Sequence, residues 1–132
     1  PIFVDCAELP MPVHAYKCGA VFGVDVRVGG RRIYHVGSAD ILESGRAPID
    51  VDLALVCVAG WPSTHQFPER VCRALNPKAV VLSHWDNFFR PMEAPAQALP
   101  AMRGPELVER LTRTLRGNLP VGALPIGGHV TV

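Results

Sequence analysis

The spacing of hydrophobic positions along this chain predicts a series of short strands. Residues 19–28 alternate between apolar and polar side chains, which is the spacing of a strand with one exposed face. The pair of glycines that follows is typical of a tight turn, so residues 31–36 are expected to return as the second strand of a hairpin. Continuous apolar runs predict two buried strands, at 52–58 and 79–83. Further short strands are expected at 2–4, 121–126 and 129–132.

Two other segments have the hydrophobic spacing of helices. In residues 67–75 the apolar side chains recur at helical spacing, Pro68 suits the first turn, and Asn76-Pro77 ends the helix. A second helix is expected to begin at Gly104, with an apolar face made of Leu107, Val108, Leu111 and Leu115. Between the elements, one helical turn is expected at 40–45 and a surface loop with three prolines at 90–102.

The composition excludes several classes of protein. Hydrophobic residues make up 48% of the chain and charged residues 19%, which is typical of a globular domain and not of a disordered segment. A formal net charge of +1 gives no argument for a nucleic-acid partner. No apolar run reaches the roughly 18 residues that a membrane span requires. We therefore expect a single domain over residues 1–132, with neither nucleic acid nor membrane as a partner.

The four cysteines predict the compartment rather than a metal site. They include no C-x-x-C pair, so a zinc knuckle is not expected. Cys57 lies in an apolar strand and Cys72 in a helix, and both are interpreted as small buried hydrophobic residues. Cysteines used in this way favour a reducing compartment, and the cytoplasm is the expected location.

The strongest indication of chemistry is a histidine at the end of the predicted strand 79–83. His84 follows that strand directly, and sites in α/β folds form at the carboxyl ends of buried parallel strands. One imidazole nitrogen can bind a metal ion while a neighbouring group orients the other. A histidine that only forms a hydrogen bond at a strand end is the alternative interpretation. The strand at 31–36 also ends in a glycine turn with small polar residues, Gly37-Ser38 and then Asp40.

The order of these features resembles the C-terminal half of the metallo-β-lactamase fold superfamily of metal-dependent hydrolases. In that family a strand ending in Gly-Asp precedes a strand of the Asp-Leu-Ala-Leu-Leu-Pro kind, a helix, and a strand ending in a metal-binding histidine. The corresponding features here are Gly37, the run Asp52-Leu53-Ala54-Leu55, the helix 67–75 and His84. The likeness is greatest to small lactonase-like and phosphoesterase-like members, and it extends from Gly19 to the C-terminus.

This resemblance implies a site around a divalent metal ion. His84 is the implied metal ligand, and His14 and Asp40 are further candidates. Asp40 and Asp86 are the candidate catalytic carboxylates; Asp40 is equally well interpreted as the cap of a turn, and Asp86 as a surface carboxylate. Zinc is the implied metal, with manganese or iron as alternatives. Such an ion lowers the pKa of its bound water to about 7 and so provides hydroxide near neutrality.

The chain departs from the family pattern at two places. Ser38 stands where the family has an aspartate that bridges two metal ions, and because a hydroxyl is neutral, one tight metal site is expected. The family's His-x-His-x-Asp-His loop does not occur in this sequence. The chain is therefore expected to be a fragment: half of an αββα sandwich, with one mixed sheet and two main helices. An exposed face of that sheet is expected to pair with a missing N-terminal half or with a second copy of the chain.

Two functions are consistent with these features. In the first, the chain completes a hydrolase of small-molecule lactones, esters or phosphoesters and is inactive by itself. In the second, it is a non-catalytic binding or assembly module that retains part of the fold. Aromatic residues near two strand ends are expected either to line an apolar substrate pocket or to pack in the core: Trp61, Trp85, Phe88 and Phe89.

Overall fold

A mixed five-stranded sheet with two α-helices makes up the computed structural model, which describes residues 20–43, 48–116 and 119–131. The strands follow one another across the sheet in chain order: β1 (Val24–Val28), β2 (Arg31–Val36), β3 (Leu53–Cys57), β4 (Val80–Ser83) and β5 (Val121–Ala123). β1 and β2 form an antiparallel hairpin, and β2 to β5 run parallel. The predicted α/β class and single mixed sheet are thereby confirmed.

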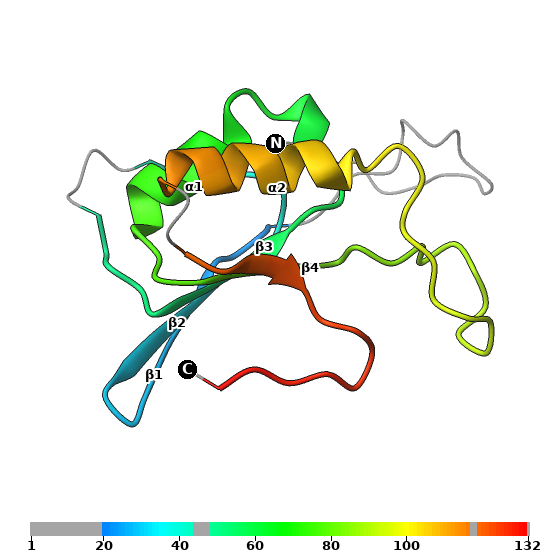
Figure 1. The fold of residues 1–132 in the computed structure, drawn as a ribbon, viewed down its shortest axis with the longest axis horizontal. Coiled ribbons are helices and arrows are strands. Elements are labelled where there is room, and N and C mark those ends of the chain that lie inside the picture. Colours follow the sequence, from blue (N-terminus) through cyan, green and yellow to red (C-terminus); the bar gives the residue numbers. More distant parts are fainter. Residues whose placement is uncertain (1–19, 44–47, 117–118, 132) are drawn as a thin grey trace.

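Both helices lie on the same side of the sheet (Figure 1). α1 (Phe67–Leu75) follows a 3-10 helix, η2 (Trp61–Ser63), and α2 (Gly104–Thr114) follows the long loop after β4. Each α-helix has a proline in its first turn, where the missing N–H costs nothing. α1 ends at Asn76, which has a left-handed φ of 39° and donates its N–H to the carbonyl of Cys72. The predicted bounds of α1 and the predicted start of α2 are confirmed.

The hydrophobic core fills the space between the helices and one face of the sheet. Paired residues of neighbouring strands point to the same side, so the pairs Ala54–Val80 and Val56–Leu82 place four buried side chains on that face. The helices contribute the fully buried Phe67, Val71, Leu75, Leu107 and Leu111.

The other face of the sheet also carries apolar side chains, and neither described helix covers it (Figure 1). Val26 pairs with Ile33 in the hairpin, and Leu55 pairs with Val81 across β3 and β4. On β1 this face is open to solvent, with 48%, 43% and 62% exposure for Val24, Val26 and Val28. We call this surface the uncovered face. Leaving such side chains in water is unfavourable at about 25 cal/mol per Å² of apolar surface.

Four predicted elements differ from the structure or lie outside it. β5 is shorter than the strand expected at 121–126, because Pro125 has no N–H to donate to a neighbouring strand. Residues 129–131 form no strand, and no helical turn is present in the described part of the turn expected at 40–45, where the Ile41 carbonyl accepts a hydrogen bond from Arg70. The strand expected at 2–4 lies outside the described residues.

Asp52, just before β3, joins three segments of the chain. Its Oδ1 accepts a hydrogen bond from Lys78 Nζ at 2.8 Å, and its Oδ2 accepts the backbone N–H of Arg32 at 2.8 Å. The hydrogen bond from Lys78, followed by that from Arg32, lowers the pKa of Asp52 from 3.8 to about 2. A carboxyl whose pKa is lowered by folding stabilises the native state above its unfolded pKa. That contribution declines below pH 3.8 and is lost as the pH falls through about 2.

Replacing Asp52 with asparagine is therefore expected to make the free energy of unfolding depend less on pH in the acid range. The urea midpoints of both proteins, measured at about pH 6 and about pH 2, should fall less in the variant than in the wild type. Glu93→Gln removes an exposed carboxyl from the loop after β4 and is expected to keep the wild-type difference between the two midpoints. An equal fall in wild type and Asp52→Asn would show that these hydrogen bonds do not stabilise the fold.

Candidate functional site

Three strands end at one edge of the sheet because β2, β3 and β4 run parallel. Gly37-Ser38 follows β2, Val58 follows β3, and His84 follows β4 directly. Neighbouring strands are spaced by about 4.8 Å, so the ends of β2 and β4 are roughly 10 Å apart. Ser38 and His84 therefore share one edge of the sheet, with the end of β3 between them.

His84 has an exposed side chain and an unusual backbone conformation. Its φ of 57° lies in the left-handed region, which residues other than glycine adopt rarely and which occurs often at functional sites. The Nδ1 atom lies 3.3 Å from Sγ of Cys57, and the ring centroid lies 4.9 Å from that of Phe88. The imidazole is thus held by neighbours on two sides and is still reachable from solvent.

Cys57 is a member of this site that the sequence analysis placed only in the core. It is the last residue of β3 and pairs with Ser83, the last residue of β4. Its side chain is buried, with 4% exposure, and burial raises the pKa of the thiol, so the sulfur is neutral. Aligning the ends of the predicted strands 52–58 and 79–83 in a parallel pair would have placed Val58 beside Ser83, with Cys57 one residue away and so near His84.

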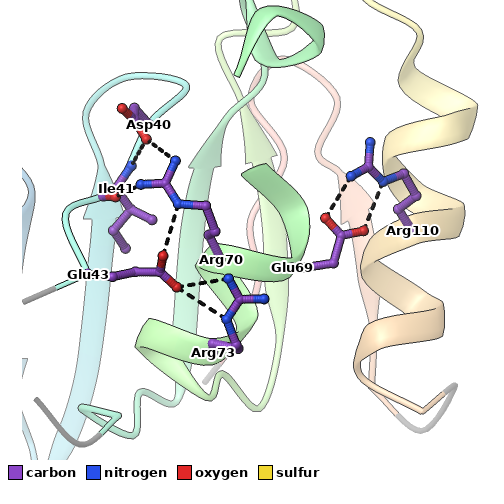
Figure 2. A network of polar contacts seen from close by, with 7 residues as sticks. All are labelled: Asp40, Ile41, Glu43, Glu69, Arg70, Arg73 and Arg110. Carbon is purple, nitrogen blue, oxygen red and sulfur yellow. Dashed lines mark hydrogen bonds and ion pairs between the residues drawn. The ribbon is translucent and has the colours of Figure 1, made fainter. Parts of the chain in front are cut away.

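Asp40 is joined to helix α1 by an ion pair (Figure 2). Its Oδ1 accepts a hydrogen bond from Arg70 at 2.7 Å and the backbone N–H of Ile41 at 2.8 Å. Arg70 also donates to the Ile41 carbonyl and, at 3.0 Å, to Glu43. The first oxygen of Asp40 already accepts both of these hydrogen bonds, so the second oxygen is the one left to act as a ligand or a base.

Two further ion pairs stabilise the helices beside this loop (Figure 2). Arg73 donates a hydrogen bond to Glu43. Arg110 of α2 donates two hydrogen bonds, of 2.9 and 2.6 Å, to the carboxylate of Glu69 in α1. The bonds from Arg110 lower the pKa of Glu69. These contacts join α1 to both the loop after β2 and α2, so they help to fix the position of Asp40.

The remaining predicted site residues occupy different places. Asp86 lies half-buried in the loop after β4, where its backbone forms an antiparallel bridge with Ala98. Its backbone position two residues beyond His84 keeps it near the strand end. His14 lies outside the described residues.

The four aromatic residues were expected either to line a substrate pocket or to pack in the core, and they differ in how deeply they are buried. Trp61 is 1% exposed and donates its Nε1–H to the carbonyl of Met102, and Trp85 packs against the core. Phe88 and Phe89 are 50% and 81% exposed, and their rings contact each other beside His84. Trp61 is therefore a core residue and Trp85 packs against the core, whereas both phenylalanines are exposed.

A pocket of about 340 Å³ adjoins the end of β2. Its polar lining comes from Tyr34, Ser38 and Asp40, and its apolar lining includes Phe22 and Ile41. Such a volume suits a small molecule. His84 does not line this pocket, so the pocket and the histidine occupy separate parts of the same sheet edge.

The described residues do not by themselves form a metal centre. Within 20–43, 48–116 and 119–131, no three His, Cys, Asp or Glu side chains lie together as a metal-binding group. A catalytic zinc ion has three protein ligands and an open position. The imidazole of His84, exposed at a strand end, has the position that one such ligand requires. Elsewhere in the described chain, no helix has the length and apolar character needed to cross a membrane.

Comparison of the chain with protein-family models, with curated proteins and with solved structures found no match.

Proposed function

We propose that this chain is the C-terminal half of a metal-dependent hydrolase of the metallo-β-lactamase fold, acting on a small-molecule lactone, ester or phosphoester. The observation that carries the proposal is the exposed His84 at the carboxyl end of β4, on the same sheet edge as Ser38. A site at the carboxyl edge of parallel strands is the usual arrangement in α/β enzymes. The order of β2, β3, α1 and β4 also agrees with the order on which the family resemblance rests.

The uncovered face supports the pairing with an N-terminal half. Val24, Val26 and Val28 expose a row of apolar side chains there. We infer that the N-terminal half of an αββα sandwich, or failing that a second copy of this chain, covers this face.

In the complete protein the residues of this chain would hold one part of the metal centre and shape its surroundings. His84 provides one ligand, and the N-terminal half provides the others; His14 is a further candidate. A bound zinc ion, or manganese or iron in its place, supplies hydroxide near neutral pH. Phe88 and Phe89 form an apolar wall beside His84. Ser38 is neutral and does not replace a bridging carboxylate, so we infer one tight metal site.

A non-catalytic module is the second candidate, and a specific contact favours it. The Asp40 side chain is already engaged by Arg70 at 2.7 Å, which suits a structural role in the loop after β2. With Ser38 neutral and Asp40 paired, this loop would contribute little to a metal centre. In either case we propose a cytoplasmic location, which the free thiols of Cys57 and Cys72 support.

Joining the chain to the residues encoded before Pro1 tests the proposal. The joined protein is expected to contain bound metal by elemental analysis and to hydrolyse at least one of a lactone, a carboxyl ester and a phosphodiester. The chain alone is expected to do neither, because it lacks the remaining ligands. Turnover by the chain alone would contradict the division of the site between two halves. A joined protein without metal and without turnover would instead support the binding module.

A further inference from the structure

The contact between Cys57 and His84 gives the two nitrogens of the imidazole different surroundings. Sγ of Cys57 lies 3.3 Å from Nδ1, within hydrogen-bonding range for sulfur. The contact forms where β3 and β4 end side by side, since Cys57 pairs with Ser83. Nδ1 is therefore engaged by a buried sulfur atom, and Nε2 is the ring nitrogen that remains for another ligand.

The sulfur is placed to accept a hydrogen bond. A thiol sulfur can accept an N–H as well as donate its own S–H, and the 3.3 Å separation from Nδ1 suits an N–H donor. Metal-binding histidines usually donate their second ring N–H to a carboxylate, a carbonyl or water, and that bond determines which nitrogen carries the lone pair. A thiol can accept this N–H without placing a charge in a buried position.

We propose that Cys57 is a positioning residue: its sulfur accepts the Nδ1–H of His84, and this bond leaves the lone pair of Nε2 directed to a metal ion. The assignment of the metal rests on the proposed function, whereas the tautomer of His84 does not. Cys57 touches neither metal nor substrate in this arrangement. It acts only by fixing the proton on one nitrogen and the orientation of the ring.

The tautomer can be measured directly in the metal-free 132-residue chain. Long-range ¹H–¹⁵N spectra distinguish an Nδ1–H from an Nε2–H imidazole, and His84→Ala identifies the signals. At a pH about two units above the ordinary imidazole pKa of about 6.5, the wild-type His84 is expected to be mainly Nδ1–H. Cys57→Ala should lower the ratio of Nδ1–H to Nε2–H about fivefold, the equivalent of one ordinary hydrogen bond.

Two variants separate this role from simple packing. Cys57→Ser keeps an acceptor for the Nδ1–H and should keep the wild-type tautomer. Cys72→Ala removes another buried thiol, 6% exposed and located in α1, and should leave the His84 signals unchanged.

An Nε2–H tautomer in the wild type would overturn the proposal, and so would an unchanged ratio in a folded Cys57→Ala. If Cys57→Ala does not fold, the wild type and Cys57→Ser still decide the question. A joined protein that binds no metal would contradict the proposed function alone, because the tautomer is measured without metal.

Discussion

Replacing Phe67 with alanine is expected to destabilise the chain by about 3–5 kcal/mol, the range found for fully buried phenylalanines. Phe67 is 0% exposed and begins α1, where its ring packs into the core between the helices and the sheet. Its removal takes away the transfer free energy of the ring and leaves a cavity. Because a small domain is stable by only about 5–15 kcal/mol in total, the variant is expected to be partly or largely unfolded at room temperature.

Urea unfolding followed by circular dichroism measures this effect. Phe89→Ala is the matched control, since it removes the same side chain from a position that is 81% exposed. The control is expected to change the free energy of unfolding by no more than about 0.5 kcal/mol. A loss of less than about 1 kcal/mol in Phe67→Ala would mean that α1 does not pack on the sheet as described.

The hydrophobic pattern was sufficient to predict the middle of the fold, because each element there has a strong local pattern. The run around Leu53–Cys57 has no polar interruption, and Phe67, Val71 and Leu75 repeat at helical spacing. The C-terminal segment is different. Its apolar residues are interrupted by Pro125 and by a glycine turn, so local pattern overestimated β5 and predicted a last strand that the described residues do not contain.

The contacts of the candidate site were not predictable in the same way, because they join residues far apart in the chain. Arg70 and Asp40 are 30 positions apart, and Cys57 and His84 are 27 apart. Neither pair has a spacing that a single helix or hairpin would bring together. Each depends on the register between parallel strands or on where α1 lies over the sheet. The position of His84 at a strand end was visible in the sequence, but its sulfur neighbour required the pairing of β3 with β4.

Replacing His84 with alanine in the joined protein is expected to lower its metal affinity by more than about 100-fold and to abolish hydrolysis. Loss of an outer hydrogen-bonding partner already costs about 10–100-fold in metal affinity, and a direct ligand contributes more.

His84 also has a left-handed φ of 57°, so alanine disturbs the backbone as well as removing the imidazole. His84→Gly separates these effects, because glycine adopts a left-handed φ without steric strain. Equal loss of metal in both variants would assign the effect to the imidazole. His129→Ala, in the exposed tail after β5, is the control and is expected to keep both metal and activity. Unchanged metal content and unchanged hydrolysis in His84→Ala would overturn the assignment of His84 as a ligand.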